Sequence, residues 1–193
     1  MFFDPMYLLF ILPGLGLSLW ASFRTKSAFN KYSKVRSMNG YTGVQAARML
    51  LDSAGLQDVK ISRAHGMLSD HYNPMTRSLA LSKVVYNAQS IASIGVATHE
   101  AGHAIQHARH YAPLWVRSTL VPTANIGSSI GYFVMLIGMF MASTNMVLVG
   151  AVLFSAVLLF QIVTLPVEFN ASSRAKALVV EHGIVTLQER QGV

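Results

Sequence analysis

Three long segments without a charged residue constrain this fold most, and they cover residues 6–23, 119–142 and 146–165. About 20 consecutive apolar residues are enough to cross the hydrocarbon core of a bilayer as a helix. Charged residues make up only 12% of the 193-residue chain, against about 25% in an ordinary soluble domain. The sequence therefore predicts a mainly α-helical integral membrane protein of one domain, residues 1–193, with about three transmembrane helices.

The basic residues predict how these helices are oriented. Twelve of the fifteen Lys and Arg residues lie between residues 24 and 117, and segments rich in Lys and Arg stay in the cytoplasm. The short link 143–145 predicts a tight hairpin, so residues 166–193 should return to the cytoplasmic side. The net charge of +7 is explained by this topology. The lipid bilayer is the expected partner, and nucleic acid is not, because no groove-reading element is visible.

Gly127 and Gly131 lie in the second apolar segment with the spacing G-x-x-x-G. Small residues at this spacing allow two helices in lipid to approach closely. Either a packing face or a chance occurrence fits this short motif.

The cytoplasmic segment 24–117 is predicted to be a small α+β unit that includes a β-hairpin or small sheet. Residues 41–56 have the pattern of an amphipathic helix, with a capping box at Thr42 and Gln45 and an end at Gly55. Short strands are expected in residues 59–64 and 66–82, with a turn at Asn73-Pro74. A long helix is expected over about 88–110.

The sequence "THEAGH" in that last helix indicates metal chemistry. Residues four apart on a helix lie on one face, so His99 and His103 could hold one ion while Glu100 flanks it. The chain has no cysteine, which leaves His, Asp and Glu as zinc ligands. Zinc (Zn²⁺) lowers the pKa of its bound water to about 7, and Glu100 could then act as the general base. The alternative is a buried helix whose histidines bind backbone carbonyls.

A catalytic zinc ion usually has three protein ligands. His107 continues the histidine stripe, but it lies about 6 Å further along the helix axis, which favours a supporting role. Glu168 follows the third apolar segment, and a carboxylate at the membrane boundary is costly unless it is paired or metal-bound. Pro166 is expected to redirect the chain into a new helix that carries Glu168. The alternative for Glu168 is an ion pair with Arg174.

Several motifs together resemble one family. The segments "HEAGHAIQH", "DHYNP", "LPVEFNASSRA" and "EHGIV" are similar to the YugP-like neutral zinc metallopeptidases of bacterial membranes. HtpX-type and CAAX prenyl membrane proteases are more remotely similar. The resemblance implies a zincin-like catalytic segment in which His99, His103 and Glu168 bind zinc and Glu100 is the general base. It also implies a protein of the bacterial inner membrane. The apolar segments predict a multi-pass protein, and the basic residues predict that its active site lies on the cytoplasmic side.

The chain departs from these relatives in two places. The remote relatives have an aspartate four residues after the ligand glutamate, where it supports a zinc histidine. This chain has Ser172 there, and Asn170 is another possible support. The second departure is the chain end, because Thr186 and Glu189 form a capping box that predicts a helix running beyond Val193.

The expected function is therefore a zinc-dependent endopeptidase that cleaves membrane or membrane-associated polypeptides. The alternative is a catalytically silent membrane scaffold that retains a structural metal. An extended substrate could add to the strand near "SDHYNP", where His71 or Tyr72 could donate to the oxyanion; the alternative is an ordinary turn. The sequence makes no prediction of oligomeric state or cleavage motif.

Overall fold

The computed structural model describes residues 5–66 and 69–193, which form helices around a small sheet. In chain order the elements are α1 (Pro5–Tyr32), α2 (Gly43–Ser53), β1 (Lys60–Ala64), β2 (His71–Asn73), β3 (Ser78–Ser82), α3 (Lys83–Asn87), α4 (Ile91–Ala108), α5 (Ala112–Phe140), α6 (Thr144–Phe154), α7 (Ala156–Glu181) and the short 3-10 helix η1 (Glu189–Gln191).

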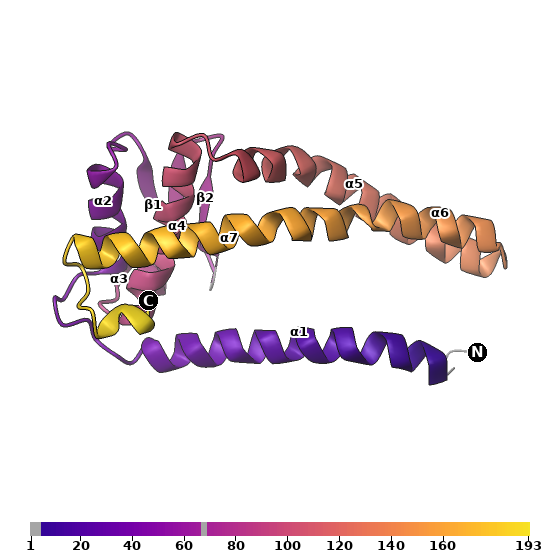
Figure 1. The fold of residues 1–193 in the computed structure, drawn as a ribbon, viewed down its shortest axis with the longest axis horizontal. Helices are drawn as coiled ribbons and strands as arrows, with labels where there is room; N and C mark the ends of the chain where they lie inside the picture. Colours follow the sequence, from indigo (N-terminus) through magenta and orange to yellow (C-terminus); the bar gives the residue numbers. More distant parts are fainter. Residues whose placement is uncertain (1–4, 67–68) are drawn as a thin grey trace.

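The molecule consists of a body and long helices that extend from it in one direction (Figure 1). The body contains α2, the sheet, α3, α4 and the end of α7. Helices α1, α5 and the α6–α7 pair extend from it, and the beginning of α1 lies at the same end as the turn between α5 and α6. This arrangement agrees with the predicted hairpin, whose two ends both return to the body.

Two helices in the described residues are long and apolar enough to cross a membrane. They are α5, with 29 residues, and the α6–α7 stretch Thr144–Glu181, with 38 residues. Many of their large apolar side chains are exposed, among them Ile126, Phe133, Phe140, Val152 and Leu159. The predicted first span, residues 6–23, is helical within α1 but is not one of these two helices. Three spans therefore remain a prediction.

The prediction of a new helix after Pro166 is wrong. Helix α7 runs through Pro166 to Glu181, so Glu168 continues the helix that contains the end of the third apolar segment. A proline inside a helix removes one backbone hydrogen bond. Packing compensates for this loss, because Val167 and Ala171 in the next turn are fully buried and α7 packs against α4.

Of the two alternatives for Gly127 and Gly131, the structure shows the packing face. A Cβ atom on Gly127 would lie 3.0 Å from the carbonyl oxygen of Leu153, and one on Gly131 would lie 2.7 Å from that of Gly150. The two glycines thus form the face of α5 that packs on α6. The connecting turn is short, since α5 ends at Phe140 and α6 begins at Thr144.

The sheet has the order β1-β3-β2, with β1 parallel and β2 antiparallel to β3. The predicted hairpin at Asn73-Pro74 is confirmed. The Asn73 side chain caps the turn by accepting a 2.9 Å hydrogen bond from the Met75 N–H. Residues 67–68, which the prediction included in a strand, lie outside the described residues. Strand β2 is an edge of the sheet and contacts α4.

Helix α2 forms as predicted and supplies much of the core of the body. Its capping box between Thr42 and Gln45 is present, and Gly55 after its end has a φ of 76°, which favours glycine. The apolar face of α2 is fully buried with β3 and α4; the main contributors are Ala46, Ala47, Leu50, Leu51, Leu79, Leu81, Ile94 and Ile105.

The helix predicted over 88–110 is shorter than expected. Helix α4 begins at Ile91, because Ser90 caps it by accepting a 3.2 Å hydrogen bond from the Ser93 N–H. The second capping box, at Thr186 and Glu189, is also present. It introduces the single turn of η1, and a helix that runs beyond Val193 stays a prediction.

Candidate metal centre

The centre forms where α4 and α7 cross in close contact. A Cβ atom on Gly102 would lie 2.8 Å from the backbone carbonyl oxygen of Ala171, closer than side-chain carbons normally approach. A glycine on α4 therefore allows the α7 backbone to pass directly beside the helix that carries His99 and His103. Glu168, one turn before Ala171 on α7, then extends toward both histidines.

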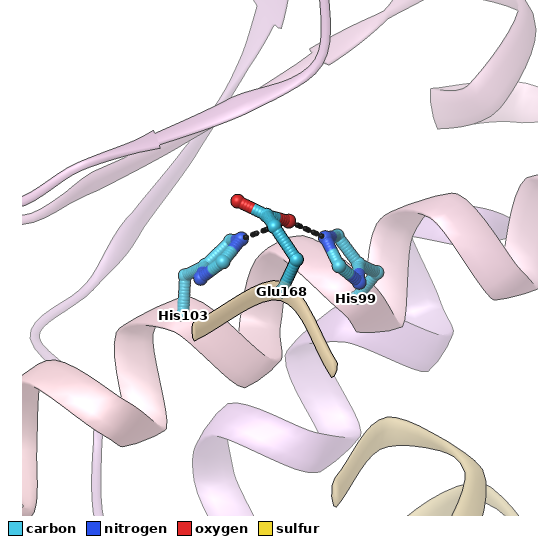
Figure 2. Close-up of side chains that lie close together, drawn as sticks. All are labelled: His99, His103 and Glu168. Atoms are coloured by element: carbon cyan, nitrogen blue, oxygen red, sulfur yellow. Dashed lines mark hydrogen bonds and ion pairs between the residues drawn. The ribbon is translucent and has the colours of Figure 1, made fainter. Parts of the chain in front are cut away.

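Figure 2 shows the Glu168 carboxylate between the two imidazole rings. Its Oε2 atom lies 3.1 Å from Nε2 of His99 and 3.4 Å from Nε2 of His103. The ligand atoms of the three residues all lie within 4.8 Å of one another, so these side chains could hold a metal ion. The structure thus brings together the three residues that the sequence proposes as ligands.

The donor set is suitable for zinc. Two histidines and one glutamate are a known catalytic zinc set, with nitrogen and oxygen ligands about 2.0–2.2 Å from the ion. Tetrahedral ligands at this radius are about 3.3 Å apart. The two nitrogen–oxygen distances at Glu168 agree with that separation. His103 is buried and His99 and Glu168 are half-buried, which leaves one side open to solvent.

Hydrogen bonds to the other ring nitrogens orient both histidines. Nδ1 of His99 lies 3.0 Å from the Ser172 hydroxyl, so the serine occupies the supporting position that an aspartate has in remote relatives. Nδ1 of His103 lies 3.0 Å from Oε1 of Gln106. That amide oxygen can only accept, so His103 carries a proton on Nδ1 and directs the lone pair of Nε2 to the centre.

A network of hydrogen bonds continues from Gln106 to α7. The amide nitrogen of Gln106 donates to the carbonyl of Val167 at 2.8 Å and to Oδ1 of Asn170 at 3.0 Å. Arg174 donates to the same Asn170 oxygen at 2.7 Å. Asn170 therefore supports the centre through Gln106. The predicted alternative, an ion pair between Glu168 and Arg174, is replaced in the structure by this contact.

Glu100 lies beside the ligand cluster and points toward the edge strand. Its Oε2 accepts a 3.0 Å hydrogen bond from the Tyr72 N–H of β2. Burial raises the pKa of the Glu100 carboxyl above its usual range, although His103, His99 and the Tyr72 N–H act in the opposite direction. A general base works best when its pKa approaches the working pH, and the burial of Glu100 shifts its pKa in that direction.

A cavity of about 470 Å³ opens beside the centre. It lies between the β2–β3 hairpin, α4, α5 and α7, and it is lined by Asp70, His71, Tyr72, Pro74, Met75, His99, Glu100, His103, Leu114, Arg117, Ser118, Val121 and Glu168. A second cavity, of about 520 Å³, shares His99 and Glu100 with it and extends along α1. Two cavities therefore adjoin the centre, one along α5 and one along α1.

The remaining candidate residues lie outside the ligand cluster. His107 contacts the Tyr72 hydroxyl through Nδ1 at 2.9 Å. Burial, together with Arg77 and His110, lowers the pKa of His107, so it is a neutral neighbour of the site. His71 is exposed, and its Nδ1 lies 2.8 Å from the Ser69 carbonyl oxygen.

Sequence reasoning missed two residues of the site. Gln106 is fully buried, and its position three residues after His103 on one helix is the signal that could have identified it. Arg117 lies 3.5 Å from Oε1 of Glu168. Its signal is weaker, because it comes from α5 and only the folded chain brings it to the centre.

Comparison with known proteins agrees with the zinc donor set. The model of the family described as "putative neutral zinc metallopeptidase" matches residues 7–193. The protein named "Putative membrane protease YugP" from Bacillus subtilis (strain 168) is 45% identical over 188 residues, which cover 97% of this chain and 84% of that relative. No solved structure matches the chain. The chain therefore belongs to this neutral zinc metallopeptidase family.

Proposed function

We propose that this chain is a zinc-dependent endopeptidase of the bacterial inner membrane. Its substrates in this proposal are membrane or membrane-associated polypeptides. The observation that carries the proposal is the convergence of His99, His103 and Glu168 beside Glu100. Three ligands and a neighbouring carboxylate are what metal-assisted peptide hydrolysis requires.

Each residue then has a defined task. His99, His103 and Glu168 would hold the zinc ion, which when bound acts as a Lewis acid and lowers the pKa of a water molecule. Glu100 takes the proton of the attacking water and passes it to the leaving amine. The Tyr72 N–H holds the Glu100 carboxylate in position by its 3.0 Å hydrogen bond.

The position of the site supports the proposed substrate class. Arg117, Ser118 and Val121 of α5 line the 470 Å³ cavity, and α5 is one of the two helices that could cross a membrane. A polypeptide at the bilayer boundary therefore has a short path to the centre. The charge distribution of the chain favours the cytoplasmic side for this boundary.

Replacing the proposed general base provides the test. Glu100→Gln keeps the size and the hydrogen bond of the side chain but removes its basicity, so we expect cleavage to fall about 10²–10⁴-fold with zinc content unchanged. New N-termini in membranes of cells that express the wild type or the variant would be identified by mass spectrometry. Equal sets of N-termini in both would favour the alternative function, a membrane scaffold with a structural metal.

A further inference from the structure

Arg117 reaches the metal centre from α5 and lines the 470 Å³ cavity together with His99, Glu100 and His103. Its side chain is 30% exposed. The Nη2 atom lies 3.5 Å from Oε1 of Glu168, while the other carboxylate oxygen, Oε2, faces the two histidines. The guanidinium is thus located next to the centre without occupying the position between the ligands.

Within the described residues, the one acceptor near the Arg117 guanidinium is Oε1 of Glu168. A charge-assisted N–H···O bond is typically about 2.7–2.9 Å long, so the 3.5 Å contact to Glu168 is a loose one. The Nε atom is buried and has no hydrogen-bond partner within residues 5–66 and 69–193. A guanidinium has five N–H groups in a fixed arrangement, and leaving them unpaired in a partly buried site is costly. Because Nε is buried, the Nη groups are the donors of Arg117 that remain for an oxygen of a ligand in the cavity that it lines.

The other donors beside Glu100 already have partners. The Tyr72 N–H donates to Glu100, and the Tyr72 hydroxyl is hydrogen-bonded to His107. The ring of His71 is bonded to the Ser69 carbonyl through Nδ1. In the described part of the chain, Arg117 is therefore the cavity-lining cation whose N–H groups lack close acceptors.

We propose that Arg117 binds the carbonyl oxygen of the scissile peptide bond and stabilises the negative charge that forms there. This inference rests on the proposed function. When the oxygen of water bonds to the carbonyl carbon, its proton goes to Glu100 and the π electrons of the carbonyl move onto the oxygen that Arg117 contacts. When the C–N bond breaks, the proton passes from Glu100 to the amine, and the carbonyl forms again.

A purely structural role for Arg117, holding Glu168 in place, predicts different behaviour. Removing such a residue would weaken zinc binding. Removing an oxyanion donor would instead weaken the binding of a tetrahedral anion, while zinc and an uncharged planar amide group would still bind. Arg117→Ala and Arg117→Lys separate the two roles. Arg109→Ala is the matched control, because it removes an exposed positive charge at the end of α4.

The test uses the zinc-loaded full chain in detergent and two probes that differ at one group. N-phosphoryl-leucyl-tryptophan carries a tetrahedral anion, and N-acetyl-leucyl-tryptophan carries a planar amide in its place. For Arg117→Ala we expect the affinity for the phosphoryl probe to fall about 10²–10³-fold and that for the acetyl probe by less than about 3-fold. Calorimetry measures both, and elemental analysis measures zinc. Arg117→Lys should recover part of the affinity, and Arg109→Ala should match the wild type.

Three results would overturn the assignment of Arg117: loss of zinc in Arg117→Ala, an equal loss of affinity for both probes, or no loss for either. Failure of the proposed peptidase function can be distinguished from failure of the Arg117 assignment alone. In that case the wild type would hold zinc and yet bind neither probe, and the role of Arg117 would be rejected with it.

Discussion

At the scale of single residues, the centre depends on two polar side chains outside the ligand cluster. Ser172 and Gln106 each bond to the Nδ1 atom of one histidine and so orient the Nε2 atoms toward Glu168. Removing a supporting partner of this kind typically lowers metal affinity about 10–100-fold. Ser172 supplies its contact through a neutral hydroxyl, where the resemblance implies a charged aspartate in the remotely similar proteases.

Removing the Ser172 hydroxyl should weaken zinc binding. For Ser172→Ala we expect an affinity about 10–100-fold lower, because the His99 ring loses the partner that fixes its orientation. Competition with a chelator of known affinity measures this change. Ser173→Ala is the control, since Ser173 is the exposed neighbour on α7 and its removal should change nothing. An unaltered zinc affinity in Ser172→Ala would show that the contact does not orient the ligand.

The sequence allowed the histidines, Glu100 and Glu168 to be proposed, because each stands in a recognisable pattern. Gln106 and Arg117 were missed for a physical reason. A glutamine on a helix resembles any polar surface residue until its burial is known. An arginine near an apolar segment is typical of the basic residues that orient a membrane protein. Their contacts to His103 and Glu168 depend on how α4, α5 and α7 pack, and local sequence patterns do not predict that packing.

At the scale of elements, the crossing of α4 and α7 determines the geometry of the site. Gly102 permits the contact with Ala171, and Gln106 bonds across it to Val167 and Asn170. Helix α2, the existence of α4, the hairpin and both capping boxes could be predicted from periodicity and local chemistry. The continuity of α7 through Pro166 could not be predicted, because the packing of Val167 and Ala171 outweighs the tendency of proline to break a helix.

Adding one methyl group at this crossing should damage both stability and the site. In Gly102→Ala the new Cβ would lie 2.8 Å from the Ala171 carbonyl oxygen, so the helices must separate. Overpacking of this kind typically costs about 1–3 kcal/mol, and Glu168 would move away from the histidines. We expect a lower unfolding temperature and weaker zinc binding.

Gly14→Ala is the control for this substitution. Gly14 is also helical, and an added Cβ there would meet no atom within 4 Å. Unfolding temperatures of both variants would be measured in the same detergent. If Gly102→Ala were as stable as Gly14→Ala and bound zinc as tightly, the close crossing would not be what positions the site.

At the scale of the whole molecule, long helices extend in one direction from a body that carries the centre (Figure 1). The turn between α5 and α6 lies at the far end, at the level of the beginning of α1. Together with the basic residues of the body, this shape predicts that the turn and the body lie on opposite sides of the membrane.

The absence of cysteine makes this topology directly testable. Met141 lies in the distant turn and is 67% exposed, and Met38 lies in the body and is 73% exposed. A membrane-impermeant maleimide should label Met141→Cys in intact protoplasts. It should label Met38→Cys only after the membrane is permeabilised. The reverse pattern would place the centre outside the cell, and labelling of both in intact protoplasts would exclude a bilayer between them.

The most direct test of the central claim is the zinc content of the purified full chain, measured by elemental analysis without chelators. Wild-type protein should hold about one zinc ion per chain, as a centre with three protein ligands should. Glu168→Gln should lose most of it, while Glu181→Gln, an exposed position on the same helix, should keep it. Equal zinc in Glu168→Gln and the wild type, or no zinc in any of the three, would contradict the account.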